Sequence, residues 1–417
     1  MNKQLKKALL NQKEYRDGFE QNRFINRLLI NKKESLLNKS LIKIIKGPRR
    51  AGKSTFLFLL LQEIDFIYVN FDEIDIVKNI DSHNDFLEVL HEVYGNTKNV
   101  FLDEIQNMPN WELFLNKLER EGYNVYVTGS NSDLLSEKFA SSLTGRYISF
   151  EFFPFSFYEY LLFLKTDGNL LEAINFFLKT GGFPEVIVND VDPETYVSDL
   201  LYSIIYKDII KRYNIRNYLS MDTLVSYLIS NFCQTINLSA ILRVTKVKSE
   251  KTLKKYLKYI ENSYICTYLS KFDFKSKKVL TSRQKIYFYD NSLLMYKNLF
   301  NSSNMGSFFE NLIFNEMVKK GIRPNYDFFY YETRNGYEVD FILKQGEKVN
   351  ALVQVCYDIL DEKTEKREIR ALLEASEELH CSNLHIVTKN TSFEKNIDGK
   401  IVKVIPFSVF YKDEFGF

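Results

Sequence analysis

Along the first third of the chain, two patterns of hydrophobic positions follow each other in turn: short apolar runs, and segments in which apolar residues recur at helical spacing. Short β-branched or aromatic runs predict strands at 41–45, 66–70, 99–103 and 123–128. Apolar residues recur every three or four positions in the segments between them, which predicts helices at 53–64, 82–94 and 111–121. Residues 1–40 have the same helical spacing. Regular strand–helix alternation is typical of an α/β fold, with a parallel sheet covered by helices on both faces.

Different patterns follow after residue 150 and predict three further domains. Residues 151–235 are rich in helix formers and aromatics at helical spacing, which indicates a small helical lid. Residues 236–300 predict two helices and then strands at 264–269 and 285–289, the outline of a winged helix. Residues 301–417 predict a second α/β domain. It opens with a helix at 308–317, and its strands are expected at 328–332, 338–343, 352–356 and 384–388.

Two glycines between the first strand and the first helix have the spacing of a phosphate-binding loop. The pattern G-x-x-x-x-G-K-[ST] is met without a gap, and its flanking strand and helix are in the required order. Glycine lets the backbone turn its N–H groups toward phosphates, and the helix that follows adds its positive end. We expect ATP to be bound here by Gly47, Pro48, Arg49, Arg50, Ala51, Gly52, Lys53, Ser54 and Thr55. Lys53 supplies the cation and the Ser54 hydroxyl a Mg²⁺ ligand.

The predicted strand 99–103 ends in the carboxylate of Asp103, and a second carboxylate, Glu104, follows it directly. Ligands sit at the carboxyl ends of strands in a parallel sheet, so Asp103 should emerge beside the phosphate loop and hold Mg²⁺. Glu104 is then placed to orient or deprotonate the attacking water. The next strand also ends in polar residues, and Ser130 or Asn131 could contact the γ-phosphate or that water.

The order of the motifs resembles that of a known ATPase family. They lie at Gly47–Ser54, Phe101–Gln106, Val127–Asn131, Thr144–Arg146, Pro154–Tyr160 and Gly181–Glu185. Together they resemble bacterial and archaeal AAA-superfamily ATPases that join a P-loop domain, here residues 1–150, to a winged helix and a C-terminal restriction-endonuclease-like domain. The resemblance implies ATP hydrolysis and Arg146 as the arginine that meets the γ-phosphate. An arginine finger must arrive from a neighbouring subunit or a moving lid, so a homo-oligomer is one arrangement to consider.

Charge is concentrated in one region of a nearly neutral chain. The net charge is +2, yet residues 240–285 contain thirteen Lys and Arg against three Asp and Glu. Such an excess is typical of binding to the phosphate backbone of DNA. The candidate contacts are Lys251, Lys254, Lys255, Lys258, Lys277 and Lys278. A solvated basic face that only packs against its neighbours is the alternative.

The last domain departs from the pattern of the nuclease fold that it resembles. The resemblance implies a magnesium site built from a helix Glu, a strand Asp and Glu-x-Lys on the next strand. Glu310 and Asp340 are present, but Gln354 and Cys356 stand where the Glu and the Lys are expected. A neutral amide holds Mg²⁺ less well than a carboxylate, and we therefore expect a degenerate site that does not cut DNA.

Composition narrows the remaining choices. The four cysteines are far apart and form no C-x-x-C pair, which suits reduced thiols in a cytoplasm. No apolar run approaches the length of a membrane span, so we expect no membrane association.

Three functions stay open: a DNA-associated ATPase, an ATP-gated metal-dependent nuclease, and an ATP-driven switch that binds an unknown protein partner without nucleic acid.

Overall fold

The computed structural model describes residues 3–19, 27–37, 41–132, 143, 145–164, 169–189, 191–297, 304–359 and 361–412. The chain forms two compact units, each described here by itself. The first contains Met1–Pro154 with Asn262–Tyr264, and the second contains Phe155–Glu261 with Ile265–Phe417. The first unit ends close to the boundary expected at 150. The expected divisions at 235 and 300 fall inside the second unit and stay predictions.

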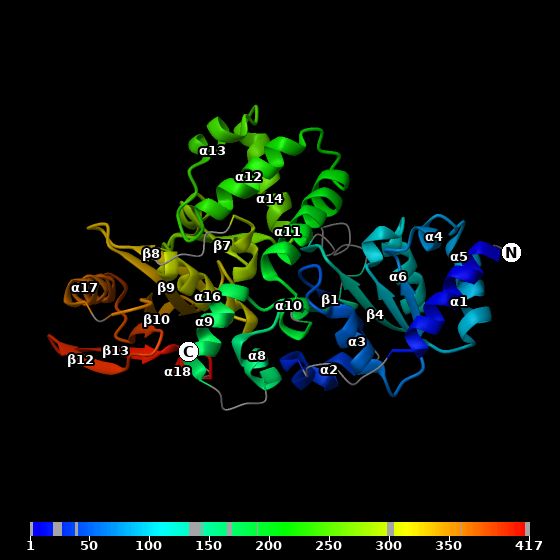
Figure 1. The fold of residues 1–417 in the computed structure, drawn as a ribbon, viewed down its shortest axis with the longest axis horizontal. Helices are drawn as coiled ribbons and strands as arrows, with labels where there is room; N and C mark the ends of the chain where they lie inside the picture. Colours follow the sequence, from blue (N-terminus) through cyan, green and yellow to red (C-terminus); the bar gives the residue numbers. More distant parts are fainter. Residues whose placement is uncertain are drawn as a thin grey trace. The chain divides into compact units, whose positions relative to one another are not determined.

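A parallel sheet forms the centre of the first unit, and Figure 1 labels two of its strands, β1 and β4. It has five strands in the order β2-β3-β4-β1-β5. The strands are β1 Ile42–Lys46, β2 Ile67–Asn70, β3 Asn99–Asp103, β4 Asn124–Gly129 and β5 Tyr147–Glu151. The four predicted strands are confirmed to within about a residue at each end, and the α/β class is confirmed with them. The edge strand β5 is not predicted by the sequence.

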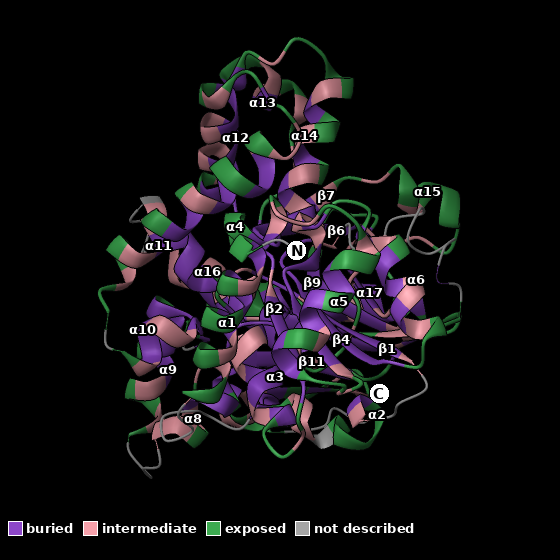
Figure 2. Cartoon of the chain, turned by 90° about the vertical axis from the view of Figure 1, so that its right-hand side faces the viewer, coloured by how far each residue is buried: buried purple, intermediate pink, exposed green. Residues whose placement is uncertain are grey.

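Helices cover both faces of this sheet. They are α1 Lys3–Asp17, η1 Leu28–Lys32, α2 Lys33–Leu37, α3 Lys53–Leu61, α4 Ile74–Val77, α5 His83–Tyr94, η2 Ile105–Asn107 and α6 Trp111–Arg120. Alternate residues of β3 show the division: Val100 and Leu102 pack with α1, α5 and α6, and Phe101 packs with α3 on the opposite face. Because both faces are covered, β1 to β4 are buried at nearly every position (Figure 2), whereas the edge strand β5 is buried only at Phe150.

The second unit begins with helices and continues into an antiparallel hairpin. The helices are α8 Phe157–Leu164, α9 Leu170–Thr180, α10 Pro184–Val188, α11 Pro193–Ser203, the π-helix η4 Ile204–Lys211, α12 Tyr218–Ser230, α13 Leu238–Thr245 and α14 Glu250–Asn262. The hairpin pairs β6 Cys266–Ser270 with β7 Gln284–Phe288. Thr235 forms an isolated antiparallel bridge with Lys285. The short, exposed helix α15 Ser276–Leu280 lies between the two strands, where the sequence predicts only a connection.

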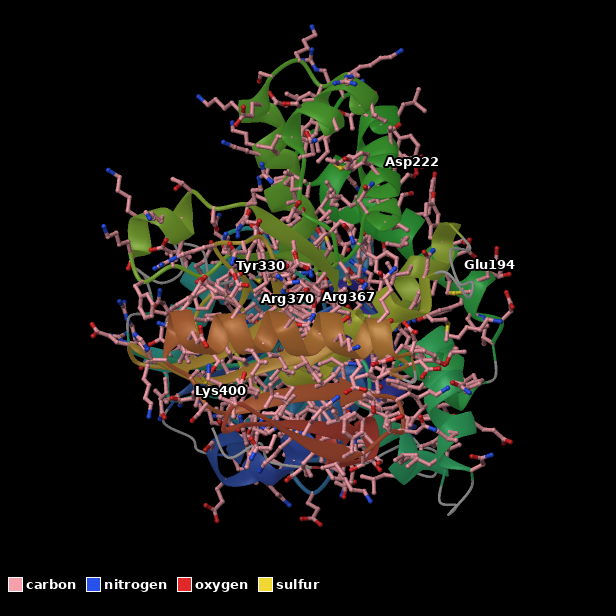
Figure 3. The ribbon with its side chains drawn as sticks, turned by 90° about the vertical axis from the view of Figure 1, so that its left-hand side faces the viewer. Glu194, Asp222, Tyr330, Arg367, Arg370 and Lys400 are labelled. Atoms are coloured by element: carbon pink, nitrogen blue, oxygen red, sulfur yellow. The ribbon has the colours of Figure 1, made fainter. Side chains whose placement is uncertain are left out.

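A six-stranded mixed sheet closes the second unit, with the order β12-β13-β11-β10-β9-β8. Its strands are β8 Phe328–Glu332, β9 Glu338–Gln345, β10 Lys348–Val355, β11 Leu384–Thr388, β12 Phe393–Ile397 and β13 Lys400–Pro406. The accompanying helices are η5 Asn291–Lys297, which leads to α16 Met305–Lys319, then α17 Glu362–Leu379, which packs on β9 to β11, and α18 Phe407–Phe410, which follows β13. Figure 3 shows α17 crossing the sheet, with Arg367 and Arg370 on it. The four predicted strands are present, and β12 and β13 are additional.

Among the residues that the structure describes, no helix is both long enough and apolar enough to cross a lipid bilayer.

Candidate nucleotide-binding site

The loop Gly47–Gly52 connects β1 to α3 at the carboxyl edge of the first sheet. A Cβ atom at Gly47 would lie 1.9 Å from the carbonyl oxygen of Phe152, so only glycine fits this position without a backbone shift. Gly52 has a φ of 93° and Arg50 a φ of 65°, which turns the chain sharply before the helix. α3 begins at Lys53, and its first N–H groups therefore face the loop. The arrangement suits an anion such as phosphate.

The ammonium group of Lys53 is held inside this loop. It donates to the carbonyl oxygens of Gly47 at 3.1 Å and Pro48 at 2.8 Å, and it lies 3.8 Å from Glu104 Oε1. The side chain is only 4% exposed. A cation that is fixed and shielded from water interacts strongly with nearby negative charge, which is the property required for a contact with nucleotide phosphates.

Asp103 accepts hydrogen bonds from three elements of the first unit. The Ser54 hydroxyl donates to Oδ1 at 2.9 Å, the Thr128 hydroxyl donates to the same oxygen, and the Tyr68 hydroxyl donates to Oδ2 at 3.3 Å. Burial and the nearby charge of Glu104 raise the pKa of Asp103 to about 6, although the bonds from Thr128 and Ser54 oppose this shift. Hydroxyl and carboxylate oxygens suit Mg²⁺. Ser54 and Asp103 are therefore the residues that would hold a magnesium ion.

Glu104 follows directly and is fixed by its own contacts. Its backbone is in the left-handed region, with a φ of 53°. Its Oε2 accepts from the backbone N–H of Ser130 at 3.2 Å and from the side-chain amide of Gln106 at 2.5 Å. Burial alone would raise the pKa of Glu104, but the positive charges of Lys53 and Arg49 and these hydrogen bonds outweigh it and lower the pKa. The side chain is thus an ionised carboxylate that can accept a proton from water.

Sequence analysis does not identify four residues that support these groups. Tyr68 and Thr128 lie near the ends of β2 and β4, and both reach Asp103. Gln106 holds Glu104, and its Oε1 is a buried oxygen without a hydrogen-bond partner in the part of the chain that the structure describes. Arg27 donates to the carbonyl oxygens of Ala51 and Phe153 and thereby braces the phosphate loop. Gln106 and Thr128 lie within the quoted motifs Phe101–Gln106 and Val127–Asn131, so the sequence offered a signal for these two residues and none for Tyr68 or Arg27.

Arg146 does not lie at this site in its own chain. It directly precedes β5, and its carbonyl accepts from the N–H of Ile42 at the amino end of β1. The phosphate loop leaves the opposite end of β1, about 13 Å away for four residues of strand. The guanidinium pairs instead with Glu119 at 3.1 Å. A contact between Arg146 and a phosphate in its own chain is therefore not supported. Thr144, from the same motif, lies outside the described residues.

Comparison with known proteins decides the family. Residues 39–161 match an AAA domain, and residues 171–304 and 305–410 match two domains of unknown function. The protein MJ1544 of Methanocaldococcus jannaschii, described as uncharacterized, is 34% identical over 417 residues, which is 92% of each chain. This chain belongs to the same family. An uncharacterized protein of Haemophilus influenzae is 29% identical over 76% of this chain and 83% of its own.

Solved structures show only a distant likeness to this AAA-domain protein. The Walker-type ATPase PABY2304 of Pyrococcus abyssi is 17% identical with a TM-score of 0.45, over 66% of this chain and 95% of that chain. AMPPCP-bound DnaA from Aquifex aeolicus is also 17% identical, with a TM-score of 0.30 over 57% of this chain and 89% of that chain.

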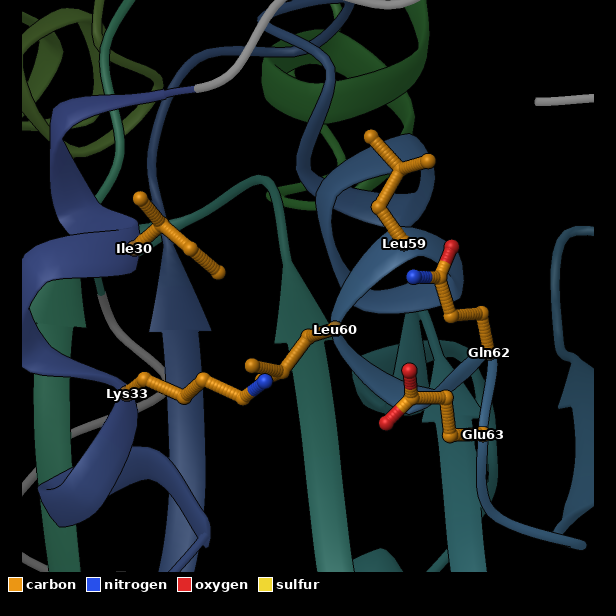
Figure 4. A pocket seen from close by; sticks show the side chains of 6 residues that line it. All are labelled: Ile30, Lys33, Leu59, Leu60, Gln62 and Glu63. Carbon is orange, nitrogen blue, oxygen red and sulfur yellow. The ribbon is translucent and has the colours of Figure 1, made fainter. Parts of the chain in front are cut away.

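The AAA domain also has a small pocket that is distinct from the phosphate loop. It has a volume of about 190 Å³ and is lined by Ile30, Lys33, Leu59, Leu60, Gln62 and Glu63 (Figure 4). Ile30 belongs to η1 and Lys33 to α2, and the other four residues lie at the carboxyl end of α3 or just after it, whereas the phosphate loop meets the amino end of α3. A nine-residue helix is about 13 Å long, so the pocket is not part of the nucleotide site.

The basic residues of the second unit differ in their surroundings. All six candidate lysines on α14 and α15 are exposed. Lys254 pairs with Glu250, Lys258 with Glu261 and Lys278 with Asp273, whereas the ion pairs found in the described ranges do not include Lys251, Lys255 or Lys277. Lys285, one of the thirteen basic residues counted in 240–285, does not belong to the basic surface. It is 1% exposed and faces carboxylates of the last domain instead of solvent.

The candidate nuclease residues are only partly brought together. Glu310 and Asp340 both approach the Lys285 ammonium, at 2.7 Å and 3.7 Å. Gln354 accepts from the N–H of Asp340 and donates to Glu368 at 2.6 Å. Cys356 packs in the apolar core beneath α17, and its thiol donates to the carbonyl of Asp358. The residues standing in the place of Glu-x-Lys therefore supply neither an anion nor a cation.

We predict that Gly47→Ala destabilises the AAA domain by roughly 1–3 kcal/mol, the usual cost of overpacking a filled site. The obstacle is the Phe152 carbonyl, which belongs to the backbone and cannot rotate away as a side chain can. Chemical unfolding measures the effect. Gly306→Ala is the matched control, because a Cβ on this glycine of α16 meets nothing within 4 Å. Equal stability of Gly47→Ala and the parent would show that the loop moves away from Phe152 at little cost.

Proposed function

We propose that the protein hydrolyses ATP with Mg²⁺ at the AAA domain and couples this activity to binding of DNA. The proposal of ATP hydrolysis rests on one observation. At one edge of the sheet the Ser54 side chain bonds to Asp103, and the Lys53 ammonium lies close to Glu104. A phosphate loop without an acidic partner would support binding alone. Here an ionised glutamate lies beside the lysine, so a base for hydrolysis is present as well.

The residues divide the work of the reaction between them. The loop N–H groups and Lys53 bind and orient the phosphates, and Ser54 and Asp103 would hold the Mg²⁺ ion, which neutralises phosphate charge when bound. Glu104 accepts a proton from the attacking water at its carboxylate. Ser130 and Gln106 keep that carboxylate in one position. Arg146 can take part only at the site of a neighbouring copy, which keeps a homo-oligomer within the proposal.

The DNA-binding part of the proposal is based on residues 218–288. Three helices, α12 to α14, precede the β6–β7 hairpin, and Thr235 adds an isolated antiparallel bridge to β7. This order of elements supports a winged helix. Exposed lysines line α14 on the side opposite its buried residues Leu253, Leu257 and Ile260.

The four free thiols are buried, which fits a reducing compartment such as the cytoplasm.

Duplex DNA is expected to raise the rate of ATP turnover by the purified protein in Mg²⁺. A rate that does not respond to any DNA tested would favour the alternative of a switch that binds another protein. Loss of intact DNA in the same mixture would favour the gated nuclease. Gel analysis of the DNA and release of phosphate from ATP can be followed in one reaction, so the three functions are separated by one experiment.

For the contacts themselves, we predict that Lys251→Glu, Lys255→Glu and Lys277→Glu together weaken DNA binding and flatten its salt dependence. Each lost phosphate contact lowers the slope of log K against log salt by roughly 0.9. The three lysines are chosen because no ion pair within the described ranges includes them. Lys348→Glu, Lys363→Glu and Lys403→Glu form the control, since these lysines are exposed on the last domain. Equal slopes for the two triple variants would place the DNA on another surface.

A further inference from the structure

A single buried cation lies among the carboxylates of the last domain. The Lys285 ammonium of β7 is 2.7 Å from Glu310 Oε1, 2.9 Å from Glu338 Oε1 and 3.7 Å from Asp340 Oδ1. Glu310 belongs to α16, and the other two carboxylates belong to β9. The Lys285 side chain is 2% exposed and those of Glu310 and Asp340 are 13% and 9% exposed. We name Glu310, Glu338 and Asp340 the carboxylate cluster.

The ammonium lies where a metal ion bound by these carboxylates would lie: it donates to Glu310 and Glu338, and Asp340 is 3.7 Å away. It has three N–H donors and three carboxylates around it. Burial disfavours its charge, yet the three carboxylates outweigh burial and raise the pKa of Lys285, so the charge is kept. In the described part of the chain, no group of three or more His, Cys, Asp or Glu is arranged to hold a metal ion. The Mg²⁺ ion implied by the nuclease resemblance therefore does not fit these carboxylates as they are arranged around the Lys285 ammonium.

The strand that carries Lys285 is fixed on every side. Its neighbours Gln284 and Ile286 exchange backbone hydrogen bonds with residues 233–236, and β6 pairs with its other edge. The Tyr287 hydroxyl donates to Glu310 at 2.5 Å, and its ring stacks on Phe314 at 4.3 Å. The side chains of Asn311 and Asn315 bond to the backbone of Phe288. These contacts hold β7, and with it the backbone of Lys285, against α16.

We propose that Lys285 is a built-in cation that closes the carboxylate cluster to divalent metal ions and fastens the β6–β7 hairpin to the last domain. The cluster is a latent metal site, and it becomes a real one only when the ammonium is removed. Fastening has a structural consequence. The hairpin carries α15 with Lys277 and Lys278, so the basic surface and the last domain move as one body within the second unit.

Thermal unfolding in Mn²⁺, without nucleotide, tests the proposal. The parent and Lys285→Ala are compared at increasing Mn²⁺, and Mn²⁺ binding is counted by titration. Lys285→Ala is expected to unfold at a lower temperature than the parent, to recover part of the loss in Mn²⁺, and to bind one more Mn²⁺ ion than the parent. Adding Asp340→Asn to Lys285→Ala is expected to abolish both the recovery and the extra ion. Any Mn²⁺ at the AAA domain is common to all three proteins and cancels.

Two results would overturn the proposal, and one of them does not depend on any Lys285 variant. If the parent itself binds a Mn²⁺ ion that Asp340→Asn removes, the ammonium does not close the cluster. If Lys285→Ala folds and gains neither Mn²⁺ binding nor Mn²⁺-dependent stability, the cluster is not a latent metal site. Lys285→Arg is the conservative control, since it keeps the positive charge; it is expected to bind no more Mn²⁺ than the parent.

Discussion

Glu104→Gln is expected to bind ATP with nearly the affinity of the parent and to hydrolyse it more slowly by on the order of 10²-fold or more, the scale of a lost general base. Glutamine keeps the size of the side chain and can still accept the hydrogen bonds from Ser130 and Gln106. It cannot take a proton from water. The low pKa of Glu104 makes this loss visible at neutral pH, because the parent side chain is already ionised there. Single-turnover hydrolysis and nucleotide binding, measured separately, check the prediction.

Two controls separate chemistry from structure in this experiment. Glu121→Gln makes the same substitution on the surface of the same unit, where the side chain pairs with Lys117, and it should leave the rate unchanged. Gln106→Ala removes a contact to Glu104 and keeps the base itself, so a smaller decrease is expected. Hydrolysis by Glu104→Gln at the parent rate would assign the proton transfer to another group.

The sequence predicts the sheet of the AAA domain well because its central strands are buried on both faces. Val100 to Leu102 form an unbroken apolar run, and such runs have few alternatives when polar residues bound them. The strand β5 is different. It lies at the edge of the sheet and only Phe150 is fully buried, so its pattern is too polar to indicate a strand. The helix α15 is missed for a similar reason, since it has no buried residue.

For the candidate sites as well, the sequence predicts only part of what the structure contains. A local motif predicts groups that lie next to each other in the chain, as it does for Lys53 and Ser54. It does not predict partners brought together by folding, such as Tyr68 beside Asp103 or Lys285 beside Glu310. A count of charges treats every lysine as a surface group. Lys285 was therefore included in a basic surface, although burial gives it the opposite environment.

The prediction for Lys53 follows from its two partners, the phosphate loop and Glu104. Lys53→Ala is expected to reduce ATP turnover by roughly 10²-fold or more, the scale for loss of a preorganised charge at a transferring phosphoryl group. The loop N–H groups remain, but the variant has no ammonium among them. Lys46→Ala is the matched control. Lys46 lies on the other side of the same loop and pairs with Glu151, so its removal should leave turnover near the parent value.

A second readout distinguishes this loss from a disordered loop. Lys53 is the largest of the influences that lower the pKa of Glu104, so its removal should raise that pKa because burial is then less opposed. A carboxylate with a raised pKa is ionised only at higher pH, and the residual hydrolysis of Lys53→Ala should therefore increase with pH over a range where the parent rate is flat. Unfolding temperature confirms that the variant is folded. If a folded Lys53→Ala hydrolyses ATP at the parent rate, the loop is not the site of phosphate activation.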